Sequence, residues 1–246
     1  KNKILIIIPS RFASTRLPEK PLVKIAGKEM VLRVAEIANY VCNKVEGCNY
    51  IVATDHEKIV NFCKENNIAV MMTSENCKSG TERCWDVTTK IAEKPDFIVN
   101  LQGDNPLCPP WFIEQLIEAW KNDKEGQVFT PSLHLSWEEY DRMKESKKIT
   151  PYSGTTVEVD KFGYALAFSK AMIPVIRNEE KVRKILDKSP VRRHIGLYSY
   201  TYDALKKYFE VEASPYELPE GLEQMRFLHN LSLIHISEPT RHLRIS

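Results

Sequence analysis

The sequence predicts an α/β protein with a mostly parallel sheet and helices on both faces of that sheet. Two observations favour this class. Short apolar runs rich in Ile and Val alternate with amphipathic helical patterns through the first half of the chain. The chain also has 246 residues, which is enough to bury one large core or a core with a smaller lobe.

The first half supplies four strands and four helices in alternation. Strands are expected at 3–8, 50–54, 68–73 and 96–102, and helices at about 30–45, 57–66, 81–92 and 110–121. Strands that are apolar throughout, rather than at every second residue, are typical of a doubly wound sheet covered on both faces.

The second half is less regular. Strands are expected at 127–133, 155–159, 164–169 and 194–200, with a charged helix or loop at 178–188 and a helix at about 202–208. Because these strands follow one another without helices between them, they predict a mixed extension of the sheet or a small lobe that closes over a substrate. Residues 232–246 lose all periodicity, and we expect a tail that is not native to the protein.

Composition excludes some classes of function. Lys and Arg total 35 against 33 acidic residues. The chain therefore has a net charge of only +2 and lacks the strong overall positive charge of a nucleic-acid binder. The longest apolar runs are too short to cross a bilayer and no signal-peptide pattern is visible, so we expect a cytoplasmic protein. The six cysteines form no zinc-spaced cluster and are expected to be reduced.

A basic loop, RFASTRLPEKPL, follows the first expected strand. Arg11, Arg16 and Lys20 recur along it, and its prolines prevent one continuous helix. In an open parallel sheet, this loop lies at the carboxyl edge where ligands bind. Small residues such as Ser14 let backbone N–H groups approach an anion, so the loop predicts a polyphosphate site. The alternative is a solvated surface face. Neither a Walker A motif nor a dinucleotide fingerprint is present.

Two further motifs are expected at the same edge. Asp104, in QGDNP after the strand at 96–102, offers the hard oxygen ligand that Mg²⁺ prefers, although it could serve only the turn. The segment SGTER places Ser79, Gly80 and Thr81 at a helix start, where N–H groups could meet a ligand. The SGTER segment is a weak signal by itself, because many helices begin with residues of these types.

Seven motifs in order carry a resemblance to a family: RFASTRLPEKPL, ATD, SGTER, QGDNP, AFSKAMIP, RRHIGLY and LEQMR. Together they resemble the 3-deoxy-manno-octulosonate cytidylyltransferases, or CMP-KDO synthetases, over about residues 3–228. The resemblance implies a Rossmann-like, nucleotide-diphospho-sugar transferase fold in a single domain over 1–231. Its nucleotide-binding half would span about 1–125 and its sugar-binding and dimerisation part about 126–231.

The resemblance also implies an activity. The enzyme would couple CTP to KDO, an eight-carbon acid sugar, releasing pyrophosphate for lipopolysaccharide synthesis in a Gram-negative bacterium, with Mg²⁺ as cofactor and a homodimer as the assembly. The anomeric hydroxyl would attack the α-phosphorus in line while cations and metal stabilise the phosphoryl charge. Positioning would carry most of the rate.

The matching positions define a candidate site. Catalytic roles fall on Arg11, Arg16, Lys20 and Asp104, with Asp104 also the metal ligand. Nucleotide binding is implied for Arg11, Ser14, Arg16, Lys20, Ser79, Gly80, Thr81, Arg83 and Gln102. Sugar binding is implied for Arg193, His194, Tyr198, Glu223 and Gln224. Arg193 or His194 is the expected partner of the sugar carboxylate.

Several departures from the family pattern keep alternatives open. Asn105 stands where the family turn has Glu, Thr155 and Thr156 where it has a Lys, and Lys170 where it has an Arg. The absence of that Lys favours 8-amino-KDO as the substrate, because a Lys there would repel the ammonium group of 8-amino-KDO. Another acid sugar such as a sialic acid is a further alternative. A second metal-binding Asp, expected near the C-terminus, is absent, which would suit a non-catalytic nucleotide-binding protein. A metal-dependent glycosyltransferase is disfavoured because no D-x-D motif occurs at the turn.

Overall fold

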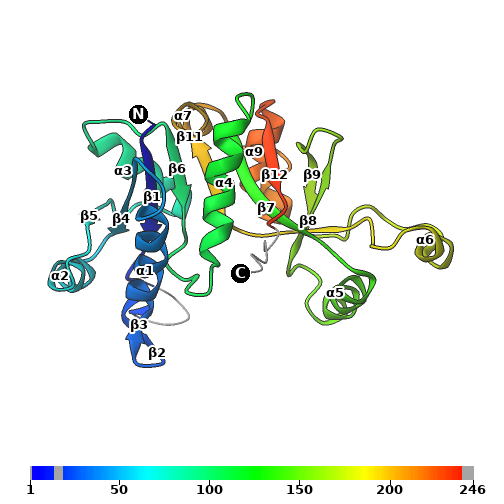
Figure 1. Ribbon diagram of the computed structural model, residues 1–246, viewed down its shortest axis with the longest axis horizontal. Coiled ribbons are helices and arrows are strands. Elements are labelled where there is room, and N and C mark those ends of the chain that lie inside the picture. Colours follow the sequence, from blue (N-terminus) through cyan, green and yellow to red (C-terminus); the bar gives the residue numbers. More distant parts are fainter. Residues whose placement is uncertain (1, 14–18, 240–246) are drawn as a thin grey trace. The chain divides into compact units, whose positions relative to one another are not determined.

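The computed structural model describes residues 2–13 and 19–239, and these residues form two compact units (Figure 1). The first unit takes in the described residues up to 117 together with 197–206, and the second takes in 118–196 and the described residues from 207. The sequence places one boundary near residue 125 and gives no sign that 197–206 returns to the first unit.

The first unit is built on a sheet whose strands run in the order β5-β4-β1-β6-β11. Four of them are parallel: β1 (Ile4–Pro9), β4 (Cys48–Thr54), β5 (Val70–Met72) and β6 (Phe97–Asn100). The fifth, β11 (Tyr198–Thr201), pairs antiparallel with β6. All of β6 and five of the six residues of β1 are buried, as expected for strands covered on both faces.

Helices alternate with these strands as the sequence predicts. They are α1 (Met30–Cys42), α2 (Glu57–Glu65), α3 (Gly80–Lys90) and α4 (Pro110–Asn122). In α1 the buried residues recur at helical spacing: Met30, Val31, Val34, Ala35, Ala38 and Val41. The predicted α/β class with a mostly parallel sheet is therefore confirmed. A short 3-10 helix η1 (Lys20–Leu22) and a hairpin of β2 (Lys24–Ile25) and β3 (Lys28–Glu29) precede α1.

The second unit contains a mixed sheet. Its strands are β7 (Val128–His134), β8 (Thr155–Val159), β9 (Ala165–Ser169), β10 (Arg192–His194) and β12 (Ile234–Ser237). The antiparallel order is β7-β10-β8-β9, and β12 lies parallel to β7. Four helices accompany them within the described residues: α5 (Trp137–Ile149), α6 (Glu179–Ile185), α8 (Glu217–Glu220) and α9 (Gln224–His229). Helix α7 (Tyr202–Glu210) follows β11.

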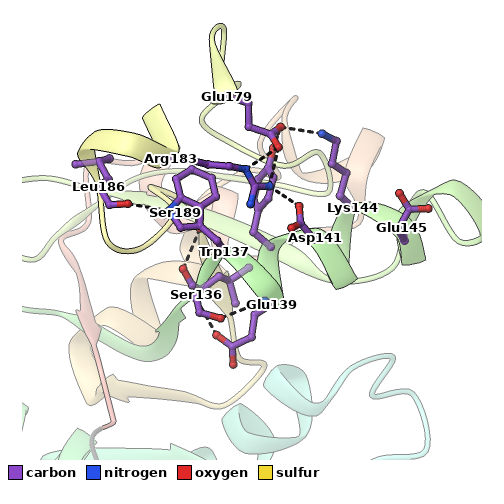
Figure 2. Close-up of polar contacts among 12 residues, drawn as sticks. Ser136, Trp137, Glu139, Asp141, Lys144, Glu145, Glu179, Arg183, Leu186 and Ser189 are labelled. Atoms are coloured by element: carbon purple, nitrogen blue, oxygen red, sulfur yellow. Dashed lines mark hydrogen bonds and ion pairs between the residues drawn. The ribbon is translucent and has the colours of Figure 1, made fainter. Parts of the chain in front are cut away.

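Helices α5 and α6 are joined by a polar network (Figure 2). Lys144 Nζ lies 2.8 Å from Glu179 Oε2, and Arg183 Nη2 lies 2.5 Å from Asp141 Oδ1. The indole of Trp137 donates a 2.8 Å hydrogen bond to the carbonyl of Leu186. Because α6 buries none of its residues, these contacts rather than a core attach it to the rest of the second unit.

Three features of the second half differ from the expected strands and helices. Helices α5, α8 and α9 are not among the predicted elements. The expected strand at 194–200 divides, so that β10 pairs within the second unit and β11 within the first. Residues of the expected tail form β12, where Ile234 is fully buried. That the tail is foreign to the protein stays a prediction, and residues 240–246 lie outside the described residues.

Candidate nucleotide-binding site

A cavity of about 290 Å³ opens at the carboxyl ends of the parallel strands of the first unit. It is formed by the end of β1 and the basic loop, by the start of α3 and by the turn after β6. The lining residues are Pro9, Ser10, Arg11, Lys20, Pro21, Met30, Cys77, Lys78, Ser79, Gly80, Arg83, Gln102, Gly103 and Asp104. The edge at which it opens is the one where α/β sheets of this kind bind ligands.

The cavity is strongly cationic. Among the residues that the structure describes, Arg11, Lys20, Lys78 and Arg83 line it, against one lining carboxylate, that of Asp104. Lys20 Nζ lies 2.7 Å from Asp104 Oδ2, which joins the basic loop to the turn after β6. The structure thus brings together the basic loop and the carboxylate that the sequence places at one edge. An anionic ligand with several charges fits this environment.

The start of α3 is closely packed against the turn after β6. Ser79 caps the helix, accepting a 3.2 Å hydrogen bond from the amide of Glu82, and Glu82 accepts one of 2.6 Å from the amide of Lys78. A Cβ on Gly80 would lie 2.6 Å from Nε2 of Gln102, so glycine is what allows this approach. Gln102 is itself held by a 2.7 Å hydrogen bond to Asn100 Oδ1.

Gly103 has a similar role at the opposite wall. Its amide donates a 3.1 Å hydrogen bond to the carbonyl of Pro9, and a Cβ would lie 2.5 Å from that oxygen. The turn therefore packs directly on the end of β1. This packing places the next residue, Asp104, beside Lys20.

Two residues expected to bind nucleotide face other partners. Thr81 is buried, and its hydroxyl lies 3.4 Å from that of Tyr200. Arg83 lines the cavity, but its side chain is only 3% exposed and its Nη2 lies 2.9 Å from Asp55 Oδ2. Asp55 therefore neutralises much of the charge of Arg83. Ser14 and Arg16, the remaining two expected residues of the basic loop, lie outside the described residues.

The sugar-side expectations fall on different surfaces. Consecutive residues of a strand face opposite sides of a sheet, and Arg193 and His194 in β10 are so arranged. His194 is buried, with Nε2 2.7 Å from the hydroxyl of Thr130 and its ring edge-on to Phe168. Burial, with a smaller contribution from Lys170, lowers the pKa of His194 to about 3. A ring with its pKa lowered in this way is neutral at pH 7, so it could offer the sugar carboxylate a hydrogen bond but no charge, and its role in sugar binding stays a prediction.

Arg193 lines another cavity, of about 410 Å³, in the second unit. Arg142 and Lys147 of α5 line it as well. The ammonium of Lys147 is committed to carbonyl oxygens, among them those of Ser153 at 2.7 Å and Lys170 at 2.5 Å. Arg193 and Arg142, both exposed, are consequently the cations of this cavity that remain accessible.

The remaining sugar-side residues lie on α9 and β11. Gln224 is buried, and among the described residues its Nε2 has no hydrogen-bond partner. The helix that carries Glu223 and Gln224 is braced by Arg226, whose Nε and Nη2 donate to the two carboxylate oxygens of Glu217 at 2.9 and 2.8 Å. Tyr198 belongs to the first unit, where its ring stacks parallel to that of Tyr200.

The sequence did not identify Lys78 or Asp55 as site residues. Lys78 directly precedes SGTER, and its place before a helix start was the available signal. Asp55 ends the ATD motif, which carried the resemblance without a role. Cys108, which follows the turn after β6, is buried, and that burial raises the pKa of its thiol to about 12, as is typical of a structural cysteine.

The described part of the chain comprises residues 2–13 and 19–239. Within those ranges no three His, Cys, Asp or Glu side chains group as a metal site. In the same residues, none of the helices has both the length and the apolar character needed to cross a bilayer.

The fold and the cationic cavity define a nucleotide-binding transferase, and a family model described as Cytidylyltransferase matches residues 5–234. The chain is 39% identical to the 3-deoxy-manno-octulosonate cytidylyltransferase of Maricaulis maris, over 92% of this chain and 84% of that one. It is 37% identical to that of Haemophilus influenzae (strain 86-028NP), over 94% and 88%. The chain belongs to the 3-deoxy-manno-octulosonate cytidylyltransferase family.

A solved structure agrees with this assignment. A CMP:2-keto-3-deoxy-manno-octonic acid synthetase complexed with CTP superposes with a TM-score of 0.83 at 32% identity, covering 96% of this chain and 90% of that one. A cytidylyltransferase from Leptospira borgpetersenii, with a TM-score of 0.59 at 16% identity, shares the fold.

Proposed function

We propose that the chain transfers CMP from CTP to the anomeric hydroxyl of 3-deoxy-manno-octulosonate, with release of pyrophosphate. The observation that carries the proposal is the cavity at the carboxyl edge of the first unit, where Arg11, Lys20 and Lys78 gather. A triphosphate is the part of CTP that needs such a concentration of positive charge. The relatives named above supply the identity of the nucleotide and of the sugar.

The chemistry follows from this electrostatic arrangement. The sugar hydroxyl attacks the α-phosphorus and gives up its proton to water, the bond from that phosphorus to the oxygen bridging to the β-phosphorus breaks, and pyrophosphate leaves with the electron pair of that bond. Lys20 and Arg11 stabilise charge on the phosphoryl oxygens and on the leaving group. The N-cap of α3 and Gln102 line the same cavity and hold the nucleotide in place.

Mg²⁺ is proposed as the cofactor, with Asp104 as its ligand in the chain. The donor fits, because Mg²⁺ is often held by one or two carboxylates, substrate phosphates and water. Asp104 already attracts a cation, the ammonium of Lys20, and its side chain is 54% exposed, which leaves room for waters. When bound, the metal would neutralise phosphate charge.

Arg193 is proposed to hold the sugar carboxylate, because its guanidinium is charged whereas the buried His194 is neutral. Gln224, whose buried amide nitrogen lacks a partner among the described residues, is proposed to donate a hydrogen bond to a sugar oxygen. Tyr198 and Glu223 stay in the proposed sugar site on the strength of the family motifs. Ser14 and Arg16 stay in the proposed phosphate site for the same reason.

A cytoplasmic homodimer serving lipopolysaccharide synthesis is part of the same proposal. The second unit carries an arm that ends in α6 (Figure 1). Val175 and Ile185 on this arm are 86% and 67% exposed, and a groove of about 370 Å³ lies between them and Pro190. Exposed apolar surface of this kind is typical of a subunit contact, and a second copy of the chain is its proposed partner.

The proposal is tested by pyrophosphate release with CTP, Mg²⁺ and a panel of KDO, 8-amino-KDO and a sialic acid. Release with KDO is expected, and release with none of the three would refute the proposal. A version of the chain that carries the family's second metal-binding Asp is assayed beside it. Release by that version alone would refute the proposal for this chain and favour the nucleotide-binding alternative.

A further inference from the structure

The carboxylate of Asp55 joins the end of β4 to two other segments of the first unit. Its Oδ1 accepts a 2.9 Å hydrogen bond from the amide of Phe12 in the basic loop. Its Oδ2 lies 2.9 Å from Nη2 of Arg83 in α3. The side chains of Asp55 and Arg83 are 13% and 3% exposed, so this ion pair is largely shielded from water. Asp55 is not among the residues that line the cavity.

Phe12 is fixed by more than this one bond. Its ring stacks on that of His56, with centroids 3.6 Å apart and planes 9° from parallel. The amide of Ser10 donates a 2.8 Å hydrogen bond to the carbonyl of Ala53. The backbone on both sides of Arg11 is therefore tied to the end of β4 and to the residue that follows it.

The other described end of the basic loop contacts the same segment. Lys58 Nζ, in the first turn of α2, lies 2.5 Å from Glu19 Oε1 and 5.4 Å from the centroid of the Phe12 ring. Residues 55–58 thus hold the basic loop at Phe12 and at Glu19. Arg11 and Lys20, which line the cavity, are the immediate neighbours of these two anchored residues.

We infer that Asp55 is a positioning residue for CTP: it fixes the backbone at Phe12, at the entry of the basic loop, so that the neighbouring Arg11 faces the triphosphate before the nucleotide arrives. The inference rests on the proposed role of the basic loop in phosphate binding. Ordering a segment at the moment of binding costs free energy and lowers the affinity, whereas a segment that is already held, as Phe12 is, avoids that cost. The ATD motif, which ends in Asp55, has a physical role in this account.

A matched control contacts the chain at the other end of β1. Asp96 Oδ2 accepts a 2.8 Å hydrogen bond from the amide of Lys3, just before β1, as Asp55 does from Phe12 just after it. Asp96 is not among the residues lining the cavity. Asp96→Ala therefore removes a comparable bond from carboxylate to backbone without touching the basic loop.

The test compares CTP binding to Asp55→Ala and Asp96→Ala by calorimetry, well below the melting temperature of either variant. Asp55→Ala is expected to bind CTP about tenfold more weakly or worse, the effect of a lost charge-assisted hydrogen bond. Asp96→Ala is expected to keep the wild-type affinity. Hydrogen exchange of the Phe12 amide is expected to accelerate in Asp55→Ala alone.

Asp55→Asn separates positioning from stability. Its amide oxygen can still accept the Phe12 hydrogen bond, but it cannot balance the charge of Arg83. We therefore expect Asp55→Asn to lose melting temperature while its Phe12 protection and CTP affinity stay closer to wild type than those of Asp55→Ala. Affinity that follows melting temperature across the variants, and not Phe12 protection, would overturn the inference.

A parallel variant distinguishes this inference from the function on which it rests. If neither Asp55→Ala nor Lys20→Met changes the CTP affinity, the basic loop does not bind the phosphates, and the proposed site is wrong. If Lys20→Met weakens binding and Asp55→Ala does not, the site stands and only the positioning role of Asp55 fails.

Discussion

The ammonium of Lys20 and the carboxylate of Asp104 lie 2.7 Å apart although 84 residues separate them in the chain. The contact forms because β1 and β6 are adjacent parallel strands, so the segments that follow them leave the sheet at the same edge. A cation for phosphate and a carboxylate for metal are thereby placed together. Each can be removed separately, which allows their contributions to be measured.

Lys20→Met is expected to weaken CTP binding by about 1.5 to 3 kcal/mol, the range for a hydrogen bond to a charged group. The aliphatic part of the side chain is retained, so the free energy of unfolding should change little. Lys24→Met is the control, because Lys24 lies on the neighbouring hairpin, outside the cavity lining, and is 65% exposed. Calorimetric titration with CTP measures both; equal affinities for the two variants would remove Lys20 from the phosphate site.

Asp104→Asn is expected to abolish most of the effect of Mg²⁺ on CTP affinity, because an amide is a poorer ligand for a hard cation than a carboxylate. Without Mg²⁺, CTP affinity should be unchanged or higher, since one negative charge has left the cavity. Titrations with and without Mg²⁺ measure this difference. The exposed Asp203, in α7, gives the control Asp203→Asn. A wild-type response to Mg²⁺ in Asp104→Asn would assign the metal to other groups.

Gly80→Ala and Gly103→Ala should differ in what they damage. At Gly80 the new methyl group meets the flexible end of Gln102, so nucleotide binding should fall while the melting temperature holds. At Gly103 it meets the backbone oxygen of Pro9 at 2.5 Å, so the turn must move, at a cost to stability of about 1 to 3 kcal/mol. Thermal unfolding and CTP titration of both variants check the contrast. A Gly80→Ala protein with full CTP affinity would show that Gln102 is not needed.

His194 predicts a pH dependence of stability. Its pKa falls from 6.5 to about 3 on folding, chiefly through burial. Between these two pH values the unfolded chain binds a proton at His194 that the folded chain does not, and this favours unfolding. The contribution of His194 to the free energy of unfolding is therefore complete above pH 6.5 and is lost as the pH falls toward 3. The slope should approach about 1.4 kcal/mol per pH unit.

Denaturant unfolding of wild type and His194→Gln between pH 7 and 4 measures that slope as a difference. His229→Gln, which changes an exposed histidine, is the control. Parallel stability curves for wild type and His194→Gln would show that the ring is charged in the folded protein.

Regular alternation made the first half of the fold predictable. Helix α1 buries a continuous stripe, and β6 is buried throughout, so both leave a strong pattern in the sequence. Helix α5 buries only Tyr140 in its 13 residues, and its polar faces hide the periodicity. Its capping box at Ser136 and Glu139 was the available signal.

Topology limited the prediction of the site. The positions of Lys20 and Asp104 follow from two strands that the sequence reveals. The opposite orientations of Arg193 and His194 depend on both residues belonging to β10. The sequence did not reveal this, because the expected strand at 194–200 is two strands in two units. The contact of Asp55 with Phe12 depends on side-chain geometry at a loop, which no pattern of residue types records.

The most direct test of the central claim is a crystal structure of the chain with CTP and Mg²⁺. The account predicts the triphosphate in the cavity at the carboxyl edge of the first unit, with phosphate oxygens on Lys20 and the start of α3. A triphosphate bound elsewhere on the chain, with Lys20 and Asp104 still paired in solvent, would contradict it.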